Sequence, residues 1–518
     1  MLRSTKKSGA LFAAALLANC FNHTDAGELI SKSTGAQSVT EKAPESNPLS
    51  FFGGAVVFDL QERLRFEARE NNFDFDSKFD SLTDDSWLLN RVRLGLLIKP
   101  SDWFNIYAQG QDAREFFSDR PKIPGVLGAE GDDAFDLRQG YIEIGNAKQF
   151  PLTLKVGRQE LSYGDERLIG TFDWNNFSRT FDAVKLRWEE KNWSLDAFAS
   201  SVAVIRRGSY NQSDLFNGNE TGRAQVFSGL YFSTTALGAQ TIDLYALDLH
   251  ENLLTRPEVR RPVLLGPGRT RLIRITPAIL GDTDFGTFGL RIKSKPGAFA
   301  HVAPTPDGKA VADGKSAPAP VLAPKPVGLD YDFEGAFQTG EVRGLDLTAF
   351  AVHAGAGYTF DVPWTPRLGL QYNFASGDHD PFDGTIETFQ NLFPTNHKFY
   401  GIMDLTAWQN MHQAVAELKV QPVKQVTAQL DYRAFFIASN DDFWYRANGT
   451  TAVRPLTPAA RDAGQFEGSQ IEFITTWNVC KYFQLQGGYA HFFAGDYLKD
   501  TGPHDDADFG YVQATFTF

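Results

Sequence analysis

The sequence lacks several features on which other classes of protein depend. Only two of its 518 residues are cysteines, so it can form at most one disulfide and its fold cannot depend on a disulfide framework. After residue 30 it has no run of 18 consecutive apolar residues, which excludes a membrane-spanning helix there. It has no phosphate-binding glycine loop, CxxC pair or HExxH motif. A formal net charge of −13 argues against general binding to nucleic acid.

The sequence does contain a pattern of alternating apolar and polar residues that repeats along the chain. Leu152, Leu154 and Val156, for example, alternate with polar or small neighbours, which is typical of a strand with one apolar face. The pattern predicts eighteen strands, near 56–69, 87–99, 103–114, 136–146, 152–161, 181–189, 193–203, 225–234, 241–250, 286–294, 330–340, 345–354, 366–376, 408–421, 424–437, 468–479, 482–493 and 509–518. We therefore predict an all-β fold, a transmembrane antiparallel β-barrel of about 18 strands, because a sheet in lipid must close on itself. The weaker segments leave 16 strands as an alternative.

The connections between these segments alternate between short turns and long polar loops. This arrangement is typical of outer-membrane barrels, in which the long loops are extracellular. The Pro/Ala-rich stretch 295–329 breaks the alternation, because it is a long insert on the short-turn side.

The chain begins with a predicted signal peptide. Basic residues precede an apolar stretch, and Thr24-Asp25-Ala26 offers a cleavage site, so we assign residues 1–26 to the signal peptide. The polar residues 27–50 are interpreted as a flexible linker, and residues 51–518 as the barrel. The predicted location is the outer membrane of a Gram-negative-type bacterium.

The last strand ends on the terminal residue of the chain. Val512, Ala514, Phe516 and Phe518 alternate with polar residues. A final strand that ends on an aromatic residue resembles the assembly signal of outer-membrane barrels. The resemblance implies that the barrel-assembly machinery is a partner.

Arginines are the candidate functional residues of the predicted lumen. Alternation places Arg63, Arg65, Arg91, Arg93, Arg187, Arg291 and Arg433 on polar faces, and Arg158, Arg167, Arg179 and Trp174 belong to the stretch 152–188. Strict counting puts Arg158 on an apolar face, so we expect it above the membrane rim or after a bulge. Guanidinium groups bind carboxylates, and a ladder of them would lower the barrier for a polyanion. The alternative is that these arginines pair with acids such as Glu67 and Asp182 and brace the wall.

The stretch 152–188 also carries a family resemblance. Its motifs VGRQELSYGDERLIG and DWNNFSRTFD resemble the alginate-export family of outer-membrane porins. LFPTNHKFYGIMD (392–404), LDYRAFF (430–436) and the stretch 468–497 are similar to the same family. The resemblance implies an arginine-lined, loop-restricted conduit for an anionic polysaccharide such as alginate or an oligouronate.

Two other functions remain open at this point. One is a general diffusion porin for small anions. The other is a barrel enzyme acting on lipid, for which His353, His412 and His491 are available, but no serine-centred motif accompanies them. We therefore expect no enzymatic activity.

Other ligands and partners follow from loop composition. Asp378, Asp380 and Asp383 faintly resemble a calcium loop, although the third acid comes one residue late, so we expect no cofactor. The barrel wall is expected to contact outer-membrane lipid. The arginine-rich stretch 256–274 is expected to face lipopolysaccharide, with folding inward as a plug as the alternative.

Overall fold

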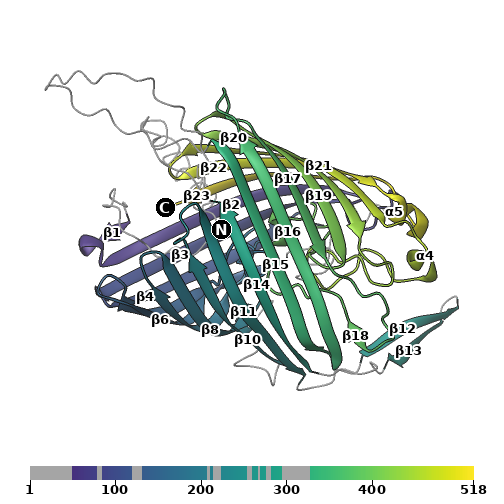
Figure 1. Ribbon diagram of the computed structural model, residues 1–518, viewed down its shortest axis with the longest axis horizontal. Coiled ribbons are helices and arrows are strands. Elements are labelled where there is room, and N and C mark those ends of the chain that lie inside the picture. Colours follow the sequence, from purple (N-terminus) through teal and green to yellow (C-terminus); the bar gives the residue numbers. More distant parts are fainter. Residues whose placement is uncertain are drawn as a thin grey trace, which may run out of the picture.

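The computed structural model describes most of the chain (Figure 1). The described residues are 49–78, 84–118, 131–206, 210–213, 223–253, 259–266, 269–275, 282–294 and 327–518. The predicted signal peptide, residues 27–48 of the predicted linker and residues 295–326 of the predicted insert lie outside them.

Eighteen antiparallel strands form one closed barrel in the described part of the chain. Each pairs with its neighbours in sequence, and pairing between the first and last, from Gln61↔Thr517 to Glu70↔Asp508, closes the sheet. The strands are β2 (Val56–Glu70), β3 (Asp85–Ser101), β4 (Phe104–Phe116), β5 (Asp133–Asn146), β6 (Phe150–Gln159), β7 (Phe181–Glu189), β8 (Trp193–Val204), β10 (Arg223–Thr234), β11 (Gln240–Leu253), β14 (Thr283–Ser294), β15 (Gly328–Val342), β16 (Leu345–Thr359), β17 (Arg367–Ala375), β19 (Met411–Val423), β20 (Val426–Ile437), β21 (Phe466–Cys480), β22 (Phe483–Ala494) and β23 (Ala507–Thr517). The predicted fold class and the count of 18 are confirmed.

The alternating sequence pattern explains which face of each strand points outward. In β2 the apolar Leu64 and Phe66 are exposed, at 38% and 46%, whereas Arg63 and Arg65 between them are buried. Because successive side chains of a strand point to opposite faces, one face can meet lipid while the other lines the interior.

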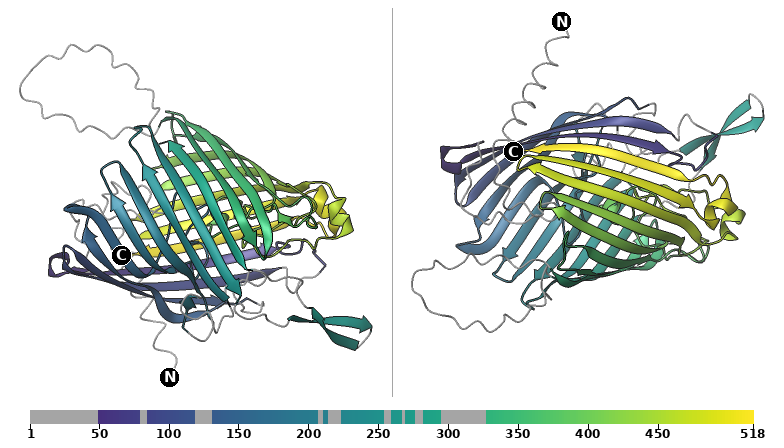
Figure 2. Two further views of the ribbon diagram at one scale, coloured as in Figure 1. Left: turned by 60° about the horizontal axis from the view of Figure 1, so that its bottom comes forward. Right: turned by 90° about the horizontal axis from the view of Figure 1, so that it is seen from above.

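The short connections lie at one end of the barrel and nearly all the long ones at the other (Figure 2). The C-terminus lies at the short-turn end, where β14 and β15 flank the predicted insert. One connection at the long-loop end is very short. Between β15 and β16, Arg343 and Gly344 both have positive φ, +55° and +78°, as a two-residue hairpin turn with the right twist requires.

Smaller elements belong to the connections and the N-terminal edge. These are β1 (Ser50–Phe51), η1 (Phe52–Gly54), β9 (Gln212–Ser213), the paired β12 (Val259–Gly266) and β13 (Arg269–Ile275), β18 (Thr385–Ile386), η2 (Asn396–Lys398), α4 (Pro458–Arg461) and α5 (Asp496–Thr501). None of the helices in the described residues is long and apolar enough to cross a membrane. The arginine side chains of the stretch 256–274 lie outside the described part, so its expected contact with lipopolysaccharide or its folding inward stays a prediction.

Two long connections fold into the barrel and occupy much of its interior. They are the β6–β7 loop (residues 160–180) and the β17–β19 loop (residues 376–410). Phe393 of the β17–β19 loop packs with buried Phe181 and Phe227 on the inner wall, in the larger of the apolar clusters. The interior is therefore partly filled by chain, as expected for a barrel of this width.

Candidate functional site

Arginines of β2 and β3 hold the tip of the β6–β7 loop against the barrel wall. The Arg63 guanidinium donates to the carbonyl oxygens of Asp173 at 2.6 Å and Trp174 at 3.1 Å. Arg91 and Arg93 donate to the Asp173 carboxylate at 3.1 and 2.9 Å. All three arginines are at least 94% buried, because the loop covers them. In this state these arginines bind the chain's own loop.

A stack of three side chains joins β2 to both inner loops. The Arg65 guanidinium carbon lies 3.7 Å from the centre of the Trp174 ring, and the His397 ring lies 3.8 Å from it at an angle of 10°. Arg65 is fully buried and also donates to Glu67 at 2.6 Å. His397 hydrogen-bonds with Asp404 at 2.9 Å. Trp174, the candidate sugar-stacking residue, therefore has groups packed on its ring.

Backbone contacts fasten the two inner loops to each other. Gly170 N donates to Phe393 O at 2.7 Å, and Phe393 N donates to Leu168 O at 2.8 Å. Arg179 donates to the Phe393 carbonyl at 2.6 Å, which places this candidate arginine at the loop–loop contact. The Thr395 hydroxyl donates to the Glu166 carboxylate at 2.7 Å. The two loops thus form one unit inside the barrel.

A second anchor lies across the interior, on β14. Arg291 donates to Asp165 of the β6–β7 loop at 2.9 Å and to Asp243 of β11 at 2.6 Å. Lys293 donates to the same Asp165 at 2.7 Å. Burial alone would raise the pKa of Asp165, but these two cations outweigh it and hold the pKa below its ordinary value. The β6–β7 loop therefore spans the lumen between β3 and β14.

A recess of about 210 Å³ remains open beside this second anchor. Arg187 donates to Asp196 at 2.9 Å, and the Lys185 ammonium lies 3.6 Å from the same acid. The rings of Tyr163 and Tyr231 stack at 4.5 Å. The lining residues are Ser162, Tyr163, Gly164, Lys185, Arg187, Ser194, Asp196, Tyr231, Ser233, Thr241, Asp243 and Arg291. The three cations of the recess are all paired with acids, Arg291 with Asp165 and Arg187 with Glu189 among them. The recess is therefore lined by ion-paired cations and acids, hydroxyls and an aromatic wall.

Two further candidate arginines support the β17–β19 loop. Arg167 lies over the Phe399 ring at 4.1 Å and 3.7 Å from Glu334 of β15. Arg433 of β20 donates to the Phe399 carbonyl and to Glu472, both at 2.7 Å. Both arginines are at least 95% buried.

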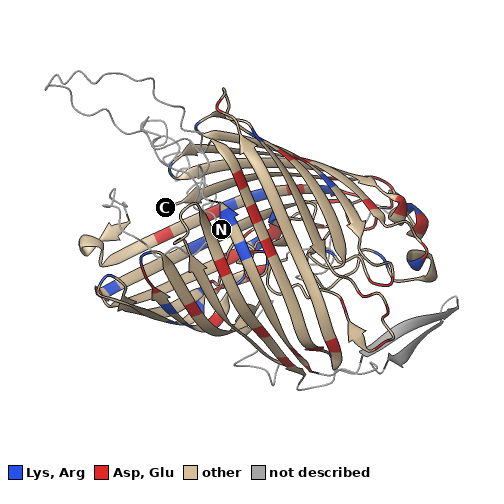
Figure 3. Cartoon of the chain, viewed as in Figure 1, with Lys and Arg blue, Asp and Glu red and all other residues tan. Residues whose placement is uncertain are grey.

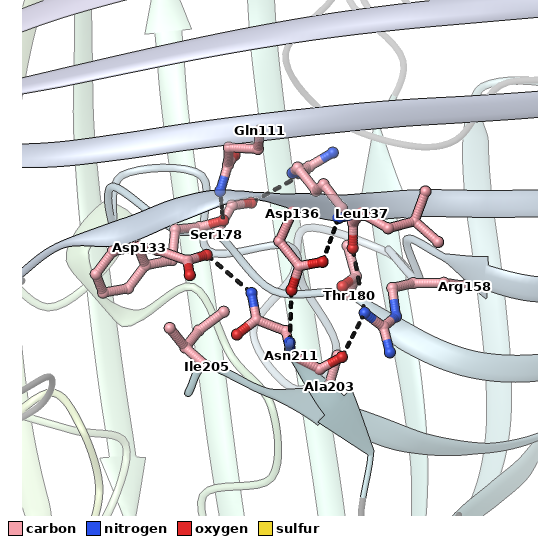
Figure 4. A pocket seen from close by; sticks show the side chains of 12 residues that line it. Gln111, Asp133, Asp136, Leu137, Arg158, Ser178, Thr180, Ala203, Ile205 and Asn211 are labelled. Carbon is pink, nitrogen blue, oxygen red and sulfur yellow. Dashed lines mark hydrogen bonds between the residues drawn. The ribbon is translucent and has the colours of Figure 1, made fainter. Parts of the chain in front are cut away.

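Arg158 lies outside this interior group. Arg158 comes two residues after Val156 on β6 and faces outward as Val156 does. The strand pairing has no register shift between these two residues, so a bulge is not the reason for the position of Arg158. Its guanidinium pairs with Asp182 at 2.8 Å. It also donates to the carbonyls of Leu137 and Asn211 (Figure 4). Arg158 therefore braces the wall near the long-loop end, and its place relative to the membrane rim stays a prediction.

Sequence reasoning missed other members of the interior. Arg138 of β5 is 6% exposed and donates to Gln109, Glu160 and Ser178. Register shifts between β4 and β5 interrupt the period of two just before it, so counting along the strand could not assign its face. Lys185 and Lys293 were on predicted polar faces, but only arginines were selected there. Figure 3 shows basic and acidic residues interspersed along the strands, in line with this pairing of opposite charges.

The predicted acidic loop has another role in the structure. Asp378, Asp380 and Asp383 each accept a backbone N–H from the residue two positions on, as turn-forming aspartates do. In the described residues, no three acidic, histidine or cysteine side chains group as a metal site.

Comparison with known proteins gives one family. The family model for alginate export matches residues 55–512 of the chain. No curated protein sequence matches it.

Crystal structures of Pseudomonas aeruginosa proteins share the fold. OccK11 (OpdR) is similar with a TM-score of 0.51 at 11% identity, covering 89% of this chain and 96% of that one. The outer membrane protein OpdK gives 0.52 at 10% identity over 89% and 98% of the two chains. The outer membrane protein OprD gives 0.50 at 12% identity over 90% and 94%.

Proposed function

The chain belongs to the alginate export family and is an outer-membrane channel, and from this premise we propose that it passes an anionic polysaccharide of the alginate type, or its fragments, across the outer membrane of a Gram-negative bacterium. The family and the fold are those of channels, not enzymes.

The observation that carries the proposal is the recess beside the β6–β7 loop, which is lined by cationic side chains. Arg187, with 27% of its side chain exposed, is the most accessible arginine of the recess and presents a planar guanidinium fork. Asp196 and Glu189 already pair with it, so a passing carboxylate exchanges with these acids and is not held tightly. Conduction needs such weak and exchangeable contacts.

Hydroxyl groups supply the second requirement for a saccharide. Tyr163 stacks on Tyr231, and the Tyr231 ring lies parallel to that of Tyr245 at 7°, so these rings cover one another's faces. The hydroxyls of a sugar bond to polar neighbours. The serine and threonine hydroxyls of the recess are suitable neighbours.

Planar-bilayer recording of the purified chain tests the proposal. Oligouronates added to one side should block the current reversibly, whereas neutral oligosaccharides of equal length should not. Arg187→Gln should weaken the block about tenfold, since one charge-assisted hydrogen bond of roughly 1.5 kcal/mol is lost. Arg343→Gln, in the exposed β15–β16 turn, is the matched control. Equal block by neutral and acidic oligomers would refute the proposal.

A channel for small carboxylates is the second candidate, and the size of the recess favours it. A volume of about 210 Å³ holds a single ring and not a polymer. One structure of OpdK, which shares the fold, was determined with vanillate. Block that does not depend on oligomer length would favour this second function, whereas block that strengthens with length favours the polymer.

A further inference from the structure

A group of polar side chains interrupts the outward face of β2, β3 and β4. Glu62 of β2 alternates with the inward-facing Arg63 and so lies on the outward face. Cross-strand register places Glu62 in one row with Asp112, through Val92, and the next row runs from Leu64 through Asn90 to Arg114. Because neighbouring strands lie about 4.8 Å apart, Glu62, Asn90, Asp112 and Arg114 fit within a patch roughly 12 Å across. We call these four residues the outer polar patch.

Apolar rows surround the outer polar patch on both sides along the strands. One such row lies toward the long-loop end and two lie toward the short-turn end. They are Phe66–Leu88–Phe116, Leu60–Leu94–Gly110 and Phe58–Leu96–Ala108. Phe58, Phe66, Leu94 and Phe116 are each more than 40% exposed. The patch therefore lies among residues of the apolar outward face, with Arg114 two residues from the end of β4.

The hydrogen-bonding groups of the patch are incompletely used. Arg114 donates through Nε and Nη2 to Asp112, at 2.8 and 2.5 Å. Within the described residues, the Glu62 carboxylate and the Asn90 side-chain amide have no hydrogen-bond partner. Lipid tails supply no donors or acceptors, so polar groups at this depth are costly unless another protein surface meets them.

We propose that the outer polar patch is the contact surface for a second copy of this chain, packed side by side in the outer membrane. A two-fold contact is self-complementary, because it brings the same surface of both copies together. It sets Glu62 of each copy against Arg114 and Asn90 of the other. The carboxylate then accepts from the guanidinium nitrogen that Asp112 leaves unused and from the amide. The flanking leucines and phenylalanines pack around these polar bonds.

Subunit counting of the full chain in lipid nanodiscs large enough for two barrels tests this proposal. We expect wild type to be dimeric and Glu62→Leu to lower the dimer fraction at least tenfold. Glu70→Leu, an exposed acid on the same face of β2 at its loop end, should leave it unchanged. Heat-dependent migration on gels checks that each variant has folded.

A charge exchange makes the test specific. Glu62→Arg and Arg114→Glu copies should each be monomeric alone, since like charges then meet. Mixed one to one, the two variants should form dimers again, because the guanidinium introduced by Glu62→Arg in one copy faces the carboxylate introduced by Arg114→Glu in the other. Monomeric wild type, an unchanged dimer fraction in Glu62→Leu, or failure of the mixture to pair would each overturn the proposal.

Discussion

Removal of the Arg91 guanidinium should release the tip of the β6–β7 loop from the wall. Arg91 is 1% exposed and contacts Asp173 through both its carbonyl and its carboxylate. Breaking a buried ion pair costs about 3–5 kcal/mol, but the Asp173 side chain is 50% exposed and Arg93 still holds it. We therefore expect Arg91→Gln to cost about 2–3 kcal/mol of loop attachment. The population with the tip detached should rise roughly 30- to 140-fold.

Single-channel recording measures the fraction of time that the loop tip is detached. A detached tip leaves a wider path, so Arg91→Gln should open more often to a larger conductance level than wild type. Arg343→Gln serves as the control, because that arginine lies in the exposed β15–β16 turn. If Arg91→Gln folds and its conductance levels and their occupancies match those of wild type, the contact of Arg91 with Asp173 does not limit the conductance.

Three other substitutions test the interior. Trp174→Ala removes the surface shared by Arg65 and His397, so it should cost about 1–2 kcal/mol and make the β6–β7 loop more sensitive to protease than in wild type. Arg291→Gln leaves Asp165 and Asp243 with less cationic compensation, so reversal potentials in a salt gradient should show weaker anion preference. Asp165→Asn should detach the loop from β14 at neutral pH. Because the folded pKa of Asp165 is below its ordinary value, the anchor is complete above about pH 4 and is lost as the pH falls through the folded value. Conductance of wild type and Asp165→Asn should therefore differ at pH 7 and converge only in strongly acidic buffer.

The strands could be predicted from the sequence because lipid enforces one rule along the whole wall. Residues such as Leu64 and Phe66 must alternate with Arg63 and Arg65, whatever else the chain contacts. The rule failed for Arg138, because register shifts between β4 and β5 interrupt the alternation of inward and outward side chains there.

The arrangement of the interior could not be predicted in the same way. The loop contacts join residues far apart in sequence, such as Arg69 and Met403, whose side-chain–backbone bond spans 334 positions. Composition identified the arginines but gave no sign that backbone carbonyls of the chain's own loops would be their partners. Some arginines pair with acids of the wall, as the alternative interpretation expected. Arg65 pairs with Glu67, and Arg158 pairs with Asp182.

The attachment of the β6–β7 loop at both β3 and β14 divides the cross-section of the barrel. On the side of β15 to β23, the β17–β19 loop takes up the space. The same loop also covers the long-loop ends of β7 and β10 through Phe393, and the recess lies off-centre, against the short-turn halves of β7 to β11. A solute in this recess meets one wall only, so its passage depends on the surface of a few strands more than on the width of the barrel.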